Sequence, residues 1–311
     1  MTDGFLNVRK PSGMTSSDVV EEVRRILSVN LGHAGTLDPM AEGVLVLGLG
    51  SARKFIAWLE NGKEYEAVMR LGATSDTLDA EGRITAEQPV TCSPEAVKEA
   101  VAGLVGDPVL PVPAYSAVHA GGRRLYEIAR SGDPVPAKTR TMRVYSITVT
   151  NIVSPLVEFR ISCATGTYVR AVSAEWGKRL GCGAVLVKLT RTRSGAFGIA
   201  DSLSLERLRE LATRGQVAPT PIGRALGHLP GAAFAPDPAA RLLMGQAVPA
   251  PAGFSAPEGE AVRLTGEDGE FLGIGTVGAG REHLIVLRPV RMLPADTGRP
   301  SAGRAIAPGR P

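Results

Sequence analysis

The sequence predicts a mixed α/β fold, of the α+β kind, followed by a smaller all-β domain. Between residues 157 and 163, apolar side chains alternate with charged or polar ones, as in an antiparallel strand that buries one face. Segments with helical periodicity lie on both sides of this strand. Beyond residue 230, short alternating segments separated by glycine-rich turns predict a small β-barrel or sandwich; they span 261–265, 271–277 and 283–288.

The first elements of the larger part can be placed in order along the chain. Asp18, with Glu21 three residues later, is typical of a helix N-cap, and apolar residues then recur at helical spacing, so we expect a helix over 18–28. The apolar run 44–49 predicts a buried strand. The alternation within 63–71 predicts a strand with one apolar face.

Two further helices are expected before the predicted domain boundary. Ser93 followed by Pro94 is a common helix start, and we expect this helix to continue to Leu104. Residues 169–180 again have helical character.

Proline content predicts where the domains divide. Prolines become frequent from Pro219 through Pro257, which indicates a linker and a boundary near residue 230. We therefore predict domains at 1–230 and 231–293. Residues 294–311, rich in proline, glycine and arginine, are expected to form a disordered tail.

Composition indicates a well-packed protein with a weakly basic surface. The chain has 311 residues, of which 44% are hydrophobic, enough for a substantial core. Its formal net charge is +4, and the eight arginines after residue 230 are balanced by eight acidic residues, so the excess lies in the larger domain. A polyanionic partner is compatible with this balance and would bind mainly there.

The cysteines and histidines exclude several classes of site. Three cysteines without C-x-x-C spacing predict reduced thiols and a cytoplasmic protein. Four scattered histidines lack ligand spacing, so no metal is predicted. The apolar runs are too short for a bilayer, and the N-terminus lacks a charged-then-apolar export pattern, so no membrane association is expected.

A glycine repeat at Gly273–Gly278 matches the G-x-G-x-x-G pattern of dinucleotide-binding loops. The residues after it do not open a helix, and a dinucleotide site needs that helix for the pyrophosphate. We therefore interpret the repeat as part of a strand.

The segment Gly32–Gly43, with the sequence GHAGTLDPMAEG, places one aspartate, Asp38, on a glycine-rich loop before a buried strand. Such a loop can present a single carboxylate to a substrate, while Asp-Pro alone is also a common turn former. We expect Asp38 to be catalytic.

This loop resembles the active-site motif of the TruB family of tRNA pseudouridine synthases. Similar strings follow the family order along the chain: Lys10–Ser16, Lys63–Tyr65, Tyr115–Ala117, Gly122–Glu127, Gly166–Arg170 and Leu189–Thr192. The resemblance implies a pseudouridine synthase fold with a large, mainly antiparallel sheet flanked by helices. It also implies that 231–293 form an RNA-binding barrel like the PUA domain.

The implied reaction is the isomerisation of uridine 55 in the T-loop of tRNA after the base is flipped out of its stack. It needs one ionised carboxylate and exclusion of water, and no cofactor. Attack at C1′, attack at C6 and removal of the C2′ proton all remain open. The expected partner is the T-arm of tRNA, with a monomeric enzyme that needs no protein partner.

The resemblance also assigns roles to individual residues. Arg170 would pair with Asp38, although an arginine near a helix start is often exposed. Tyr65 would stack on the target base, or only pack in the strand. His33 would fill the place of the flipped nucleotide.

Further site residues follow from the same resemblance. Tyr168 and Leu189 would pack around the aspartate and the base, or fill the core, and Lys10 would shape the pocket. Residues 121–143 contain six basic and two acidic residues and resemble an RNA-gripping insertion, or a solvated basic loop. Its Arg123 and Arg124 are expected to bind substrate.

Arg191 is expected to add to the same RNA-binding face. Three functions stay open at this point: the tRNA pseudouridine synthase, a non-catalytic RNA-binding protein that uses the same groove, and a guide-RNA-dependent relative.

Overall fold

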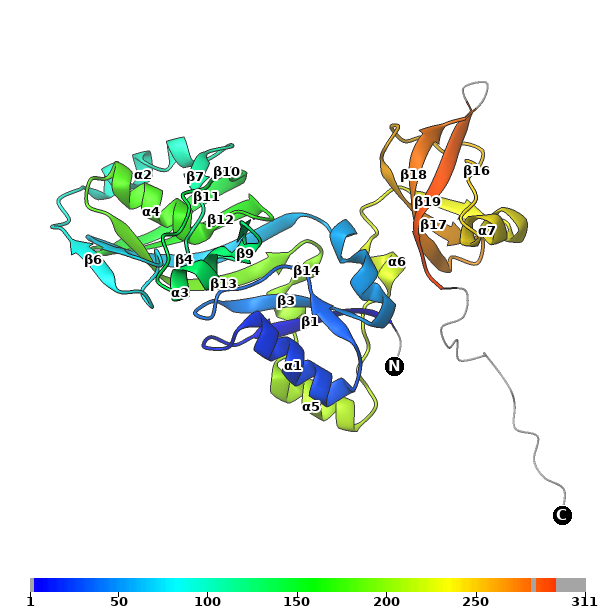
Figure 1. Ribbon diagram of the computed structural model, residues 1–311, viewed down its shortest axis with the longest axis horizontal. Coiled ribbons are helices and arrows are strands. Elements are labelled where there is room, and N and C mark those ends of the chain that lie inside the picture. The colour runs from blue at the N-terminus through cyan, green and yellow to red at the C-terminus, as the bar shows by residue number, and fades with distance from the viewer. Residues whose placement is uncertain (1–2, 281–283, 295–311) are drawn as a thin grey trace, which may run out of the picture. The chain divides into compact units, whose positions relative to one another are not determined.

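The structure is a computed structural model that describes residues 3–280 and 284–294 (Figure 1). Its internal contacts divide the chain into two compact units, Met1–Thr220 and Pro221–Pro311. This division falls at Thr220 and not near residue 230, because the short helix α6 (Ile222–Ala225) packs within the second unit. There, Nη1 of Arg263 donates a hydrogen bond to the carbonyl of Gly223 at 2.8 Å.

The first unit is built on a large sheet, and the expectation that it is mainly antiparallel is confirmed. Its strands are, in sheet order, β1 (Gly4–Lys10), β3 (Glu42–Leu49), β13 (Ala184–Ser194), β4 (Gly62–Leu71), β12 (Leu156–Ala164) and β11 (Val144–Val153), with β2 (Leu31–His33) on β3 and β14 (Phe197–Gly198) on β13. The one parallel contact in this order joins β3 and β13, over two residue pairs.

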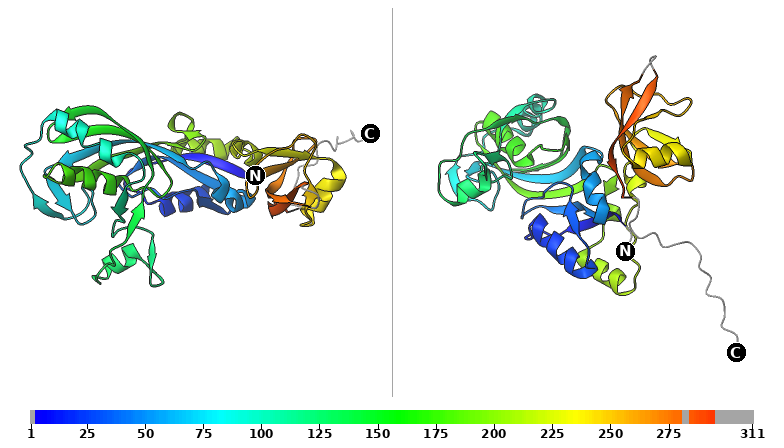
Figure 2. Two further views of the ribbon diagram at one scale, coloured as in Figure 1. Left: turned by 90° about the horizontal axis from the view of Figure 1, so that it is seen from above. Right: turned by 45° about the vertical axis from the view of Figure 1, so that its right-hand side comes forward.

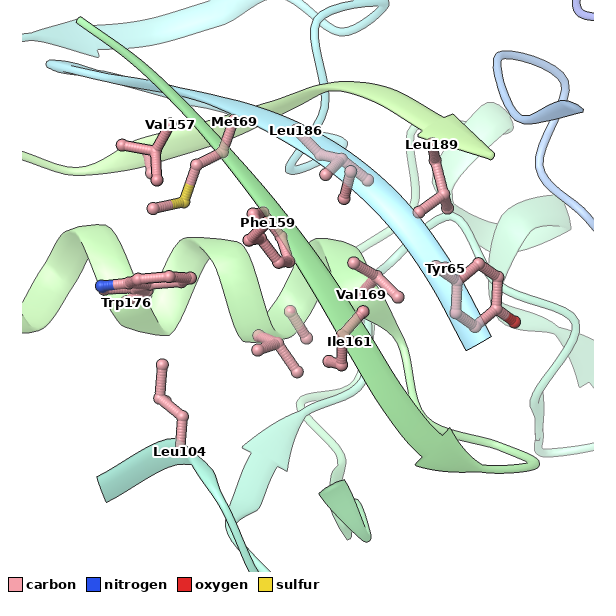
Figure 3. Close-up of a cluster of buried hydrophobic side chains, with 14 of the residues drawn as sticks. Tyr65, Met69, Leu104, Val157, Phe159, Ile161, Val169, Trp176, Leu186 and Leu189 are labelled. Carbon is pink, nitrogen blue, oxygen red and sulfur yellow. The ribbon is translucent and has the colours of Figure 1, made fainter. Parts of the chain in front are cut away.

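One face of the sheet packs against helix α4 (Val169–Arg179) and forms the main core (Figure 3). Phe159 of β12 meets Trp176 of α4 edge to face, with ring centroids 5.3 Å apart. The indole Nε1 of Trp176 donates to the carbonyl of Val97 at 3.0 Å, so this buried polar group is paired. The predicted alternation of β4 and β12 is confirmed, since their apolar residues face this core.

A second core lies at the β1 and β3 end of the sheet, where helices α1 (Ser16–Leu27) and α5 (Leu205–Thr213) pack (Figure 1). The helix over 18–28 is confirmed, but Asp18 is not its N-cap. Thr15 caps the helix: its hydroxyl accepts from the Asp18 backbone N–H, and the Asp18 carboxylate accepts from the Thr15 N–H. The cap is this reciprocal pair, so the helix begins two residues earlier than expected.

The helix predicted from Ser93 to Leu104 is shorter than expected. Ser93 does cap it, but α2 spans Pro94–Glu99, and a separate 3₁₀ turn, η2, covers Ala102–Leu104. The backbone changes there to hydrogen bonds between residues three apart, such as Leu104 N–H to the Val101 carbonyl.

Smaller elements complete the first unit. The two-stranded sheets are β5 (Ala73–Ser75) with β6 (Ile84–Glu87), β7 (Val109–Pro111) with β10 (Thr139–Thr141), and β8 (His119–Ala120) with β9 (Arg123–Arg124); the remaining helices are η1 (Gly50–Trp58), α3 (Leu125–Arg130) and η3 (Ile199–Asp201). The hairpin β8–β9 and helix α3 extend away from the large sheet (Figure 2, left).

The second unit contains one curled sheet of five strands. Their order is β15 (Gly231–Phe234), β17 (Ala261–Gly266), β18 (Phe271–Ala279), β19 (Ile285–Met292) and β16 (Val248–Pro249), and helix α7 (Pro236–Leu243) packs on them. The predicted small β domain is confirmed, as a half-barrel with β15 and β16 at its edges. The glycine repeat Gly273–Gly278 lies inside β18, as interpreted from the sequence.

Two further expectations from the sequence concern the C-terminal tail and membrane-spanning segments. The predicted tail falls, from residue 295 onward, outside the described residues. No helix in the described part of the chain has the length and apolar character needed to cross a membrane.

Because the core around α4 is well packed, removing a buried side chain there should lower the free energy of unfolding substantially. Leu186 of β13 is completely buried in the main core. We expect Leu186→Ala to lower the free energy of unfolding by about 2–5 kcal/mol, measured by urea denaturation. Val153→Ala, at a side chain that is 63% exposed, is the control and should change it by about 0.5 kcal/mol or less. Equal effects of the two substitutions would contradict this account of the core.

Candidate active site

The loop that carries Asp38 is fixed by hydrogen bonds from the N-terminal segment. The Ser16 hydroxyl accepts from the Leu37 N–H at 2.8 Å and donates to the Leu37 carbonyl at 3.1 Å. Gly13 N–H donates to the carbonyl of Pro39 at 2.9 Å. The residues on both sides of Asp38 are therefore held in place, while its side chain stays 32% exposed.

Lys10 also holds the Asp38 loop in place. It is completely buried, and its Nζ donates to the carbonyls of Ala41, Pro11 and Pro39 at 2.6, 2.9 and 3.1 Å. Burial lowers its pKa to about 8, although the charge of Asp38 acts in the opposite direction. Lys10 therefore supports the Asp38 loop, and its expected role in shaping the substrate pocket remains a prediction.

Arg170 and Asp38 form an ion pair with two parallel hydrogen bonds. Nε and Nη2 of Arg170 each lie 2.9 Å from one carboxylate oxygen of Asp38. Arg170 stands in the first turn of α4 and is 3% exposed, so it is not the surface arginine that its position near a helix start also allowed. This bidentate pair fixes the direction of the carboxylate.

The remaining N–H groups of Arg170 are also occupied. Nη1 donates to the carbonyl of Thr77 at 2.8 Å and lies 3.5 Å from the Asp79 carboxylate, and Nη2 donates to the carbonyl of Tyr115 at 2.9 Å. Asp79, whose side chain is 6% exposed, is a site residue that sequence reasoning missed. Its carboxylate in turn accepts from the Thr77 hydroxyl at 2.6 Å.

Tyr65 and Leu189 project from neighbouring strands at the edge of the main core, with the Tyr65 hydroxyl at the outer end of its ring (Figure 3). They are 8% and 5% exposed. Burial raises the pKa of Tyr65, so its phenol is neutral at neutral pH. Tyr168, directly before α4, is partly buried against the same cluster.

His33 ends strand β2 beside this loop and is partly buried. Burial, and then the charge of Arg191, lower its pKa, so the imidazole is neutral at neutral pH. Its Nδ1 is buried and makes no hydrogen bond within the described residues.

The expectation that Arg191 belongs to an exposed basic face is wrong. It is 1% exposed, and its Nε, Nη2 and Nη1 donate to the carbonyls of Val44, Gly35 and Thr36 at 2.7, 3.1 and 3.5 Å. Arg191 therefore holds the Asp38 loop from inside the protein.

Arg123 and Arg124 lie elsewhere, on the exposed β8–β9 hairpin (Figure 2, left). Arg123 is paired with Asp133 at 2.9 Å, and the guanidinium carbon of Arg124 lies 5.9 Å from the ring centre of Tyr126. Both arginines are exposed to solvent, and neither contacts Asp38. In the described part of the chain, no three histidine, cysteine or acidic side chains gather as a metal site requires.

Two family models match the chain. The description "TruB family pseudouridylate synthase (N terminal domain)" covers residues 24–169, and "Pseudouridine synthase II TruB, C-terminal" covers 230–293. The tRNA pseudouridine synthase B of Aromatoleum aromaticum is 38% identical over 278 residues, which are 88% of this chain and 89% of that protein. This chain belongs to the TruB family.

Other relatives agree with this membership. The tRNA pseudouridine synthase B of Clostridium kluyveri is 43% identical over 208 residues, or 66% of this TruB-family chain and 72% of that protein. Among solved structures, a chain in the crystal structure of a Cbf5-Nop10-Gar1 complex matches with a TM-score of 0.72 and 26% identity, covering 94% of this chain and 85% of that one. The resemblance described from the sequence is thus confirmed.

The buried lysines of this TruB-family chain predict a pH dependence of stability. Lys63 is 7% exposed, and burial, followed by the charge of Arg191, lowers its pKa from 10.5 to about 8. Between these pH values the unfolded chain holds this proton more tightly than the folded one, so stability rises with pH there. We expect the free energy of unfolding of the wild type, relative to Lys63→Met, to increase by on the order of 3 kcal/mol from pH 8 to 10.5.

Urea denaturation at a series of pH values measures this difference. Lys178→Met is the matched control, because that side chain is 82% exposed, and its difference from the wild type should stay flat. If the difference in free energy of unfolding between the wild type and Lys63→Met stays constant from pH 8 to 10.5, burial does not destabilise the charged form of Lys63.

Proposed function

We propose that this chain converts uridine 55 in the T-loop of tRNA to pseudouridine, with Asp38 as its catalytic carboxylate. The observation that carries the proposal is the pairing of this partly exposed carboxylate with the buried Arg170 guanidinium, through two hydrogen bonds of 2.9 Å. The names of the relatives, tRNA pseudouridine synthase B, support tRNA as the substrate.

The reaction rearranges bonds within one nucleotide. The bond from C1′ to N1 breaks, the base turns over, and a bond from C1′ to C5 forms, while C5 loses a proton and N1 gains one. Electrons and atoms balance without an oxidant or a transferred group, so we propose that no cofactor takes part. Side chains must supply a nucleophile or base at the sugar and a group that handles the proton.

Asp38 suits the first role because it presents an ionised oxygen in a fixed direction. Its two hydrogen bonds from Arg170 are made to the carboxylate form, and its loop is held on both sides by backbone contacts. The same geometry serves attack at C1′, attack at C6 or removal of the C2′ proton.

Tyr65 is the proposed second catalytic residue, and Tyr168 and Leu189 are proposed to pack around the flipped base. A nucleobase stacked on an aromatic ring gains roughly 1–3 kcal/mol, which offsets part of the cost of leaving its helical stack. The Tyr65 ring lies at the edge of the core, with its hydroxyl at the outer end of the ring (Figure 3).

The contacts proposed for the rest of the RNA come from two regions. His33, neutral and partly buried at the end of β2, is proposed to occupy the space of the flipped nucleotide. The insertion 121–143, through Arg123 and Arg124, is proposed to contact phosphates of the T-arm. The second unit, within which the TruB C-terminal model matches, is proposed to bind RNA.

We further propose that the protein acts as a monomer in the cytoplasm, on tRNA alone. The three cysteines, Cys92, Cys163 and Cys182, are free thiols, which is consistent with a reducing compartment.

The decisive assay is incubation of the purified protein with an unmodified tRNA transcript, followed by chemical mapping of pseudouridine. The wild type should modify position 55, and Asp38→Asn should reduce product to the detection limit while tRNA affinity stays nearly unchanged. Asp237→Asn, at an exposed position of α7, is the control and should react as the wild type does.

Each other outcome overturns a defined part of the proposal. Product at a different position would contradict uridine 55. Tight binding without product would favour a non-catalytic RNA-binding protein, and activity only with an added guide RNA would favour a guide-dependent enzyme.

The exposed arginines of the hairpin predict a salt-dependent contribution to binding. Replacing Arg123 and Arg124 by glutamine should weaken tRNA binding and reduce the slope of log affinity against log salt by about 1 for each phosphate that the variant no longer neutralises. Arg25→Gln, at a 72% exposed arginine of α1, is the control. Filter binding over a salt series measures both slopes, and identical slopes for the double variant and the wild type would exclude phosphate contacts by this hairpin.

A further inference from the structure

Arg191 and Tyr65 stand directly opposite each other in the antiparallel pairing of β13 with β4. The next pair on the same face, Leu189 opposite Ala67, lies in the main core. Directly opposed residues of antiparallel strands have neighbouring side chains on one face of the sheet. The Arg191 side chain therefore starts next to the Tyr65 ring.

From this position the Arg191 guanidinium extends to the loop of Asp38. It donates to the carbonyls of Gly35 and Thr36, immediately before Leu37 and Asp38, and to Val44 in the strand that follows the loop. One side chain thus joins the strand of the tyrosine to the loop of the aspartate. In the part of the chain that the structure describes, Arg191 forms no salt bridge with a carboxylate.

The Arg191 guanidinium also affects the Tyr65 hydroxyl electrostatically. Burial raises the pKa of Tyr65, Arg191 lowers it, and Cys163 and Asp38 raise it. A guanidinium has only donor N–H groups, so in a hydrogen bond between the two side chains the phenolic oxygen would be the acceptor. The hydroxyl hydrogen is then directed away from Arg191 and is free to meet another group.

We propose that Arg191 is a positioning residue that holds the Tyr65 hydroxyl in place beside the Asp38 loop. The inference rests on the proposed function, in which C5 must lose a proton and N1 must gain one. A phenol fixed as an acceptor toward Arg191 presents its hydrogen, or after losing it a lone pair, to the substrate. Arg191 acts through Tyr65 and touches neither the RNA nor the reacting atoms.

The test compares Arg191→Lys in the wild-type and Tyr65→Phe backgrounds, by single-turnover reaction of tRNA with excess enzyme. Lysine keeps the charge but lacks the planar, forked donors. We expect a rate about 100-fold lower in the wild-type background with unchanged tRNA affinity, and a further loss of at most about threefold in the Phe background. Arg160→Lys, at a 69% exposed arginine paired with Glu66, should keep the wild-type rate.

An equal loss of rate in both backgrounds would overturn the proposal, because Arg191 would then act only through the Asp38 loop. Weaker tRNA binding by Arg191→Lys would also overturn it, by showing a role in RNA contact. Circular dichroism and thermal unfolding establish whether each variant is folded.

A second measurement needs no substitution. In a crystal structure of the wild-type protein, an Arg191 guanidinium nitrogen should lie within about 3.2 Å of the Tyr65 oxygen. A longer separation, or a water between them, would exclude the contact even if Arg191→Lys does not fold. If the wild type makes no pseudouridine at all, the proposed function fails, which is a separate outcome from a failure of this inference.

Discussion

The site depends on one buried guanidinium. Arg170 has five N–H donors, and each of them faces an acceptor: two on Asp38, and one each on the carbonyls of Thr77 and Tyr115 and the carboxylate of Asp79. These acceptors come from segments far apart in the sequence. A buried arginine is stable only when its donors are satisfied, so the Asp38 carboxylate is oriented only when all these segments are in place.

Two other buried cations, Lys10 and Arg191, donate to backbone carbonyls rather than to acidic side chains. Lys10 donates to carbonyls on one side of the Asp38 loop, and Arg191 donates to carbonyls on the other. Gly43 lies where this loop enters β3, with φ of +104°, and a β-carbon there would clash with the backbone of Arg191. The loop has little secondary structure of its own, and these contacts replace it.

Local sequence patterns predicted most helices and strands. The features they did not predict depend on contacts between residues far apart in the sequence. The strands β4 and β12 and the helix α4 follow directly from periodicity. The sequence of the Asp38 loop led to the proposal that this carboxylate is catalytic. Asp79 carries no local signal, because its role comes from Arg170, a distant residue. The burial of Arg191 was also missed: charged residues recur along β13, and a register shift between Arg191 and Arg193 breaks the alternation there.

The cation-rich surroundings of Asp38 also matter for the approach of its proposed substrate. A lone carboxylate would repel the phosphates of an incoming RNA, and low-dielectric surroundings screen that repulsion poorly. Here the buried cations Lys10, Lys63, Arg170 and Arg191 outnumber the two carboxylates that pair with Arg170, those of Asp38 and Asp79. This excess of buried positive charge would lower the electrostatic barrier to bringing a polyanion up to the Asp38 carboxylate, as the proposed function requires.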